Sequence, residues 1–180
     1  TELADTNQSM ALTDMLTGLP NRRHLEENLL AALASAGGQR NRVGVLFCDV
    51  NKFKQVNDTL GHAAGDQVLE HVALMLSQAV RGADTVTRYS GDEFVVLIPW
   101  LEHPAELEAV AVRVRSCLAG AVTIAGSELR LGMSVGQAET AFPADADPAA
   151  HKELAKALLL AADQDMYRVK TEMRGASGTG

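Results

Sequence analysis

Two adjacent carboxylates, Asp92 and Glu93, stand in the stretch RYSGDEF (residues 88–94), on a glycine turn between two segments of strand character. Successive side chains of a strand point to opposite faces, so these two carboxylates do not reach one ion together if the chain there is extended. A second ligand has to come from elsewhere, and Asp49 lies near the end of the apolar segment VGVLFCDV (residues 43–50). Mg²⁺ binds carboxylate oxygens and commonly shares its coordination shell with substrate phosphates. Asp49 and Asp92 are therefore the predicted ligands of a divalent metal ion.

Each of these two carboxylates has a simpler explanation when it is taken alone. Asp49 then merely ends a strand, and Asp92 merely occupies a polar turn. However, a carboxylate buried at position 49 is costly without a compensating partner, and the segment that follows it carries further polar groups. The combination favours a metal site.

The segment NKFKQVNDTLGHAAGD (residues 51–66) follows the predicted strand directly. The chain should turn sharply there, which exposes backbone N–H groups of the kind that bind phosphate. Asn57 and Asp66 offer the carboxamide and the carboxylate that a guanine edge requires. Taken alone, Asp66 is better explained as the N-cap of a helix.

Two basic residues near the C-terminus, Lys170 and Arg174, are four positions apart in a predicted helix. They therefore share a face of that helix and are able to hold a triphosphate together. The alternative is a solvent-exposed last turn whose cations complement the helix dipole.

Length, composition and charge limit the class of protein. The 180 residues suit one domain, and 47% hydrophobic against 4% aromatic residues predicts a core of aliphatic side chains. A formal net charge of −7 gives no basic field for nucleic acid or an anionic membrane surface.

Two cysteines, Cys48 and Cys117, form no disulfide framework or zinc motif, which fits a reducing cytoplasm. No apolar run approaches the roughly 18 residues of a membrane span. The chain lacks an initiator Met, so we expect an excised fragment of a larger parent, either soluble or membrane-anchored.

Hydrophobic periodicity predicts alternating helices and strands. The first and last predicted helices cover residues 22–35 and 150–172. Of the two between them, one contains Val68, Val72, Leu76 and Val80 and stops at Gly82, and the other runs from Pro104 to Leu118. The predicted strands cover residues 43–50, 85–89, 94–98 and 129–135, and a loop covers 142–149. The middle two strands form a tight hairpin. This order favours an α+β fold, with an antiparallel-rich sheet and helices packed on it.

Four motifs now identify a resemblance. DMLTGLPNRR, DVNKFKQVNDTLGHAAGD, RYSGDEF and ADQDMYRVK occur in the order in which the GGDEF domains of the diguanylate cyclase family carry their own DxLTGLPNRR, DxDxFKxxNDxxGHxxGD, RYGGDEF and ADxAxYxAK. The chain thus resembles a GGDEF domain from about Asp14 to Arg174. On this resemblance we expect a linker or the end of a signalling helix over residues 1–13, the catalytic domain over 14–174 and a flexible tail over 175–180.

The resemblance implies both a fold and a reaction. The fold is nucleotide-cyclase-like: a ferredoxin-like βαββαβ core whose central, mostly antiparallel five-stranded sheet is surrounded by helices. The reaction condenses two GTP into cyclic di-GMP, with release of pyrophosphate, across a homodimer whose two protomers each hold one GTP. Each active site is expected to use two Mg²⁺ ions, or Mn²⁺ in their place, and an upstream sensory domain is expected to control it.

Carried over residue by residue, the resemblance assigns roles to this sequence. Asp49, Asp92 and Glu93 are the expected catalytic residues, and they bind metal together with the backbone carbonyl of Val50; Asp92 also assists deprotonation of the attacking hydroxyl. The expected substrate-binding residues are Asn57 and Asp66 at the guanine, Phe53, Lys54, Lys170 and Arg174 at the β- and γ-phosphates, and Ser90 and Gly91 in the signature loop.

A control site is also implied. Arg81 and Asp84 form an RxxD motif at the position where the family binds its product as an inhibitor. A guanidinium suits phosphate or the Hoogsteen edge of guanine. The simpler explanation is that Arg81 lies in the last turn of a helix and Gly82 caps it.

The sequence departs from the family pattern at a few positions. Ser90 replaces the first glycine of the signature and adds a side chain where substrate passes close to the backbone, so we expect retained but altered activity. Asn51 stands where the family usually has Asp, and Met173 and Gly175 replace the usual neighbours of Arg174.

Two other functions stay open. One is an inactive GTP-binding domain that regulates an attached module, such as a cyclic di-GMP phosphodiesterase. The other is a non-enzymatic cyclic di-GMP receptor acting through Arg81 and Asp84.

Overall fold

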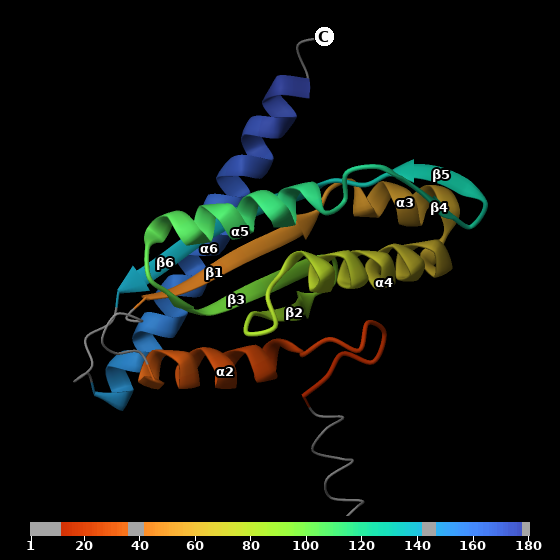
Figure 1. The fold of residues 1–180 in the computed structure, drawn as a ribbon. Helices are drawn as coiled ribbons and strands as arrows, with labels where there is room; N and C mark the ends of the chain where they lie inside the picture. Colours follow the sequence, from red (N-terminus) through yellow and green to blue (C-terminus); the bar gives the residue numbers. More distant parts are fainter. Residues whose placement is uncertain (1–11, 36–41, 142–146, 178–180) are drawn as a thin grey trace, which may run out of the picture.

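The structure is a computed structural model that describes residues 12–35, 42–141 and 147–177 (Figure 1). In chain order its elements are α2 (Arg22–Ser35), β1 (Arg42–Val50), α3 (Phe53–Leu60), α4 (His62–Ala79), β2 (Thr85–Ser90), β3 (Glu93–Leu101), α5 (Pro104–Ser116), β4 (Ala121–Ile124), β5 (Ser127–Arg130), β6 (Met133–Ala141) and α6 (Pro148–Ser177).

A sheet of four strands in the order β2-β3-β1-β6 forms the centre of the fold. All three strand pairings are antiparallel. With α4 and α5 as its connections, this is the βαββαβ arrangement that the family resemblance implied, and the predicted α+β class is confirmed. The expected fifth strand is not in this sheet in the described part of the chain, where β4 and β5 pair with each other in a separate ribbon.

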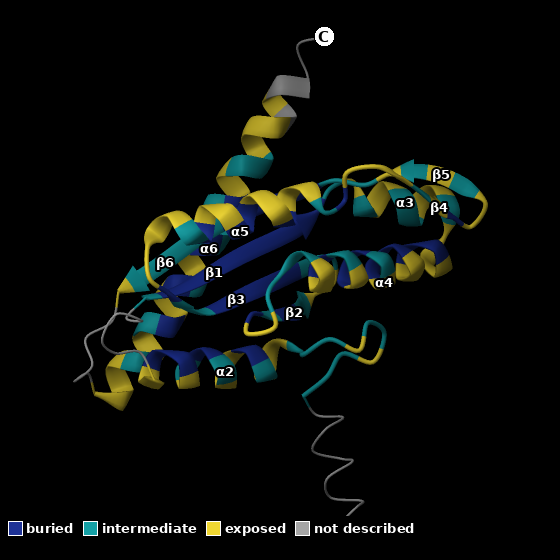
Figure 2. Ribbon diagram, viewed as in Figure 1, coloured by how far each residue is buried: buried dark blue, intermediate teal, exposed yellow. Residues whose placement is uncertain are grey.

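Helices cover both faces of the sheet (Figure 1). One face packs against α4 and α5 through residues such as Val72, Leu76 and Val110. The other packs against α2 and α6, where Leu29 and Ala162 belong to a second core cluster. Strand β1 lies between these two layers and is buried almost throughout (Figure 2). The near-continuous apolar segment at residues 43–50 was therefore correctly predicted as a strand buried on both faces.

Helix α6 approaches the sheet unusually closely at Gly136. A Cβ atom at this position would lie 2.0 Å from the backbone nitrogen of Met166 and 2.3 Å from the carbonyl oxygen of Ala162. Since real Cβ atoms do not come this close to backbone, only glycine permits the contact. The approach determines how near to β1 the next turns of α6 lie, including Lys170.

Several boundaries differ from the predictions. The predicted strand 129–135 is wrong: β5 ends at Arg130 and β6 begins at Met133, and the carbonyl of the intervening Gly132 accepts a hydrogen bond from the Asn51 N–H at 2.9 Å. Helix α3 was missed, because its eight residues are short for a periodic signal. It begins directly after Lys52, which adopts the left-handed conformation with φ 59°.

The remaining differences concern helix ends. Helix α4 ends at Ala79, before the predicted stop at Gly82, and α6 runs from Pro148 to Ser177, into the region predicted as a flexible tail. Most of the predicted linker (residues 1–11) and part of the predicted loop (142–146) lie outside the described residues. In the described ranges no helix is long and apolar enough to cross a membrane.

Candidate active site

Four polar residues form a row across one end of the sheet, one from each strand. Asp49 on β1 lies opposite Glu93 on β3 and Ser134 on β6, and Glu93 in turn lies opposite Ser90 on β2. Asp49 follows Phe47 by two positions, so both side chains point to the face that α2 and α6 cover. The two widely separated motifs that carry Asp49 and Glu93 are thus neighbours in space.

Asp49 is a buried carboxylate with a cationic partner. Its residue is 5% exposed, and the Nζ of Lys170, on α6, donates a hydrogen bond to its Oδ1 at 2.6 Å. A buried charge needs such a partner. Lys170 therefore contacts the carboxylate that the sequence predicts as a metal ligand.

Asp92 lies in the turn between β2 and β3, and its backbone carbonyl accepts a hydrogen bond from the N–H of Val50 at 3.1 Å. Burial raises the pKa of the Asp92 carboxyl above its ordinary value, and the charge of Asp49 raises it further. The positive charge of Lys170 opposes the rise but does not cancel it. The two carboxylates therefore share one electrostatic environment in which another cation is favourable.

The donor set at this point suits magnesium. In the part of the chain that the structure describes, no group of three or more His, Cys, Asp or Glu side chains lies close enough to hold a metal ion. Mg²⁺ does not require one, because it commonly binds through one or two carboxylates and takes its other ligands from waters and substrate phosphates. Asp49 and Asp92 fit this pattern.

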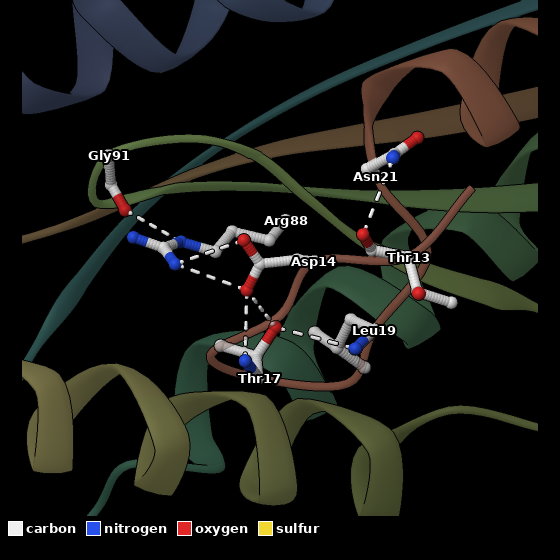
Figure 3. A network of polar contacts seen from close by, with 7 residues as sticks. All are labelled: Thr13, Asp14, Thr17, Leu19, Asn21, Arg88 and Gly91. Atoms are coloured by element: carbon white, nitrogen blue, oxygen red, sulfur yellow. Dashed lines mark hydrogen bonds and ion pairs between the residues drawn. The ribbon is translucent and has the colours of Figure 1, made fainter. Parts of the chain in front are cut away.

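The signature loop is held from outside by Arg88 (Figure 3). Its Nε donates to the carbonyl oxygen of Gly91 at 3.1 Å, and its Nη1 lies 3.1 Å from both carboxylate oxygens of Asp14. Asp14 also accepts from the backbone N–H of Thr17 at 2.9 Å and from its hydroxyl at 2.7 Å. These contacts tie residues 14–21 to the loop that carries Asp92.

The pKa of Asp14 reflects this arrangement. Burial alone would raise it, but the hydrogen bonds from Thr17 and the ion pair with Arg88 together hold it below its ordinary value. The contact between the motifs DMLTGLPNRR and RYSGDEF was not predicted from the sequence. The signal that could have found it is the complementary charge of the two motifs at positions 14 and 88.

The predicted guanine-binding pair lies where α3 meets α4. Asn57 is on α3, and its Oδ1 is buried without a hydrogen-bond partner among the described residues. Gly65 on α4 makes this possible, because a Cβ there would lie 1.9 Å from that oxygen. Asp66 follows Gly65 and is exposed. The helix-cap explanation of Asp66 is wrong, since α4 begins at His62 with Gly61 as its N-cap.

The predicted phosphate-binding residues are spread over two elements. Phe53 and Lys54 open α3, whose N-cap residue Lys52 makes no side-chain capping hydrogen bond. The first N–H groups of a helix have no partner within the helix, so an uncapped N-terminus can receive an anion. Phe53 packs against the core and Lys54 is exposed. Arg174 belongs to α6, but its side chain lies outside the described part of the structure.

A comparison with known families decides what kind of domain this is. A family model described as "Diguanylate cyclase, GGDEF domain" matches residues 11–176. The chain belongs to the GGDEF domain family of diguanylate cyclases. The predicted family is thereby confirmed.

Relatives of this GGDEF domain include proteins of named function. Diguanylate cyclase TpbB of Pseudomonas aeruginosa is 38% identical over 178 residues, which are 97% of this chain and 39% of TpbB. Response regulator PleD of Caulobacter vibrioides is 38% identical over 177 residues, which are 96% of this chain and 37% of PleD. A solved structure of the GGDEF domain of TpbB is 38% identical, with a TM-score of 0.76, and the match covers 89% of each chain. The chain thus spans about two fifths of the length of these two curated relatives.

The RxxD motif of this GGDEF domain forms a closed turn. The backbone N–H of Arg81 donates to Oδ2 of Asp84 at 3.0 Å, and its guanidinium lies 5.0 Å from the centroid of the Trp100 ring. Arg81 lies beyond the end of α4, so its explanation as a last-turn helix residue is wrong. The Arg81 guanidinium forms ion pairs, with Nε 3.5 Å from Oδ2 of Asp84 and Nη1 3.7 Å from Oε2 of Glu106. Among the described residues, Nε and Nη2 of Arg81 and Oδ1 of Asp84 are nevertheless buried without hydrogen-bond partners.

Proposed function

We propose that this GGDEF domain is a diguanylate cyclase. Two copies face each other, each with one GTP, and the 3′-hydroxyl oxygen of each GTP attacks the α-phosphorus of the other. At each α-phosphorus the bond to the β-phosphate oxygen breaks and pyrophosphate leaves, while the hydroxyl proton passes to a base or to solvent. One cyclic di-GMP and two pyrophosphates result. The observation that carries the proposal is the convergence of Asp49, Asp92 and Lys170 at one end of the sheet.

Asp49 and Asp92, with the backbone carbonyl of Val50, are the proposed metal ligands. A bound pair of Mg²⁺ ions, or Mn²⁺, supplies charge neutralisation at the phosphates. Glu93 is the neighbouring carboxylate on the same row of the sheet, and it is a third acidic group near the site. Phosphoryl transfer needs positioning and charge neutralisation more than covalent chemistry, so a few fixed charges suffice.

Substrate binding is proposed at α3, α4 and α6. The unpartnered Oδ1 of Asn57 suits a guanine N–H donor, and Asp66 accepts from the same edge. Phe53 and Lys54 at the start of α3 are proposed to hold the β- and γ-phosphates, with Lys170 and Arg174 from α6. Ser90 and Gly91 border the path of the substrate in the signature loop.

Product inhibition is proposed at Arg81 and Asp84. Several of their buried nitrogen and oxygen atoms make no hydrogen bond, although the two residues form an ion pair, and a guanine base and a phosphate of cyclic di-GMP would supply those hydrogen bonds. Activity is expected in the cytoplasm, where the two free cysteines Cys48 and Cys117 stay reduced. Since the relatives are longer, we further propose that an upstream sensory domain sets the spacing of the two copies.

One observation favours a second function. The Ser90 hydroxyl donates a hydrogen bond to Oε2 of Glu93, so this carboxylate oxygen of the signature already has a partner within the protein. If this contact prevents turnover, the domain is a GTP-binding regulator of an attached module, such as a cyclic di-GMP phosphodiesterase.

The test is product formation from GTP. Nucleotide-free domain at high concentration is incubated with GTP and MgCl₂, and cyclic di-GMP and pyrophosphate are measured by mass spectrometry and an enzymatic assay. We expect both products from the parent chain and neither from Asp92→Asn. GTP binding and dimerisation without product would overturn the cyclase and favour the regulatory domain.

A further inference from the structure

The side chain of Ser90 contacts a signature carboxylate. Its Oγ donates a hydrogen bond to Oε2 of Glu93 across the end of the β2–β3 hairpin. Glycine, the residue usual at this position in the family, has no group to make this contact. The hydrogen bond is therefore a feature of this chain and not of the general signature.

Glu93 has two neighbours on its face of the sheet, Ser90 on one side and Asp49 on the other. Directly opposed residues of antiparallel strands have Cβ atoms about 4.5–5.5 Å apart, so the Glu93 carboxylate is within reach of either neighbour. Asp49 is a carboxylate already paired with Lys170, and it has no donor to offer Glu93. Ser90 attracts it as a donor, and the carboxylate accordingly turns toward β2.

The surroundings of Glu93 agree with this orientation. Glu93 lines a cavity of about 650 Å³ between α2 and α6, together with Arg22, Tyr89 and Leu159. Burial raises the pKa of the Tyr89 hydroxyl, the charge of Arg22 lowers it, and the charges of Glu26 and then Glu93 raise it. Glu93 thus lies at the cavity between the two helices.

We propose that Ser90 is a positioning residue that holds Glu93 away from the divalent-metal site, leaving the metal there to Asp49 and Asp92. The inference rests on the proposed function, because it concerns the metal site of that reaction. Its consequence is a weaker metal site than the same residues would form with glycine at position 90. Ser90 therefore sets the metal concentration that the domain requires.

Direct metal binding tests this role without relying on turnover. Mn²⁺ is titrated into the full chain in the presence of a GTP analogue with a methylene group between the α- and β-phosphates, and free Mn²⁺ is read by electron paramagnetic resonance. Ser90→Ala removes the hydroxyl and keeps the Cβ, while Ser90→Thr keeps the hydroxyl. We expect Ser90→Ala to bind Mn²⁺ roughly tenfold more tightly, the effect of one hydrogen bond to a charged group. Ser90→Thr should bind as the parent does.

Two further variants decide the interpretation. Ser90→Ala combined with Glu93→Gln should lose the gain, because the released side chain then carries no charge. Equal or weaker Mn²⁺ binding by Ser90→Ala, or a gain that persists in the double variant, overturns the role of Ser90. Asp92→Asn should bind Mn²⁺ much more weakly than the parent. If Asp92→Asn binds Mn²⁺ as the parent does, both the proposed metal site and the role of Ser90 are wrong. If Asp92→Asn loses Mn²⁺ binding while Ser90→Ala binds Mn²⁺ as the parent does, only the role of Ser90 is wrong.

Discussion

Lys170 on α6 places its Nζ 2.6 Å from Oδ1 of Asp49 on β1, although 121 positions separate the two residues in the chain. The Asp49 side chain is 7% exposed and that of Lys170 is 23% exposed, so water screens this pair only weakly. Lys170 thus neutralises the carboxylate that we propose as a metal ligand. We propose two roles for Lys170: it stabilises the fold through Asp49, and it binds a phosphate of the substrate.

Replacing Lys170 should therefore affect stability before it affects chemistry. Lys170→Met keeps the aliphatic stem and leaves a buried negative charge unpaired, which we expect to lower the free energy of unfolding by about 3 kcal/mol. Urea unfolding without divalent metal measures this. The double variant Asp49→Asn/Lys170→Met should be more stable than Lys170→Met alone. Equal stability of the two would contradict the pairing.

The contact between Gly65 and Asn57 predicts a selective loss of nucleotide binding. Alanine within a helix is normally favoured over glycine by about 1 kcal/mol, but at position 65 the new Cβ would lie 1.9 Å from Oδ1 of Asn57. The asparagine must move, so we expect Gly65→Ala to weaken GTP binding roughly tenfold, measured by calorimetry.

Asn57→Ala serves as the matched variant for this prediction. Gly65→Ala/Asn57→Ala should be more stable than Gly65→Ala alone, because the side-chain oxygen that the new Cβ would meet is gone. The double variant should still bind GTP weakly. If Gly65→Ala binds GTP as tightly as the parent chain, Asn57 does not contact the nucleotide.

The ion pair between Asp14 and Arg88 predicts a pH dependence of stability. The pKa of Asp14 is lowered in the folded state. Its contribution is therefore fully present above the unfolded value of about 3.9 and is lost as the pH falls through the folded value. We expect the difference in unfolding free energy between the parent and Asp14→Asn to be constant near pH 7 and to shrink below about pH 4.

Urea unfolding of both proteins at a series of pH values gives this difference directly, since the other titrating groups cancel. Asp58→Asn, which removes an exposed carboxylate of α3, is the control and should unfold as the parent does. A difference between the parent and Asp14→Asn that grows toward low pH would refute the role given to Arg88.

Local patterns predicted much of this fold. The apolar segment at 43–50 and the hairpin around Gly91 depend on neighbours in sequence, and both are found as predicted. Lys170 was placed on a helix correctly, yet nothing local indicates that its partner is Asp49. Nor does periodicity reveal the partner of Arg88. Such pairs arise from the packing of whole elements, and motif resemblance located the residues without their contacts.

The close approach of α6 to Gly136 gives the most direct test of how the site is positioned. In Gly136→Ala the new Cβ meets backbone atoms of Ala162 and Met166 at 2.3 Å or less. Backbone cannot rotate away as a flexible side chain does, so α6 has to shift outward and carry Lys170 from Asp49. We expect a loss of about 3 kcal/mol in unfolding free energy, the upper part of the usual range for overpacking, and a large loss of cyclase activity. Gly82→Ala, where the added Cβ meets nothing within 4 Å, is the control and should keep its stability. If Gly136→Ala loses stability and keeps full activity at a temperature where it stays folded, the placement of Lys170 by this contact does not matter to the reaction.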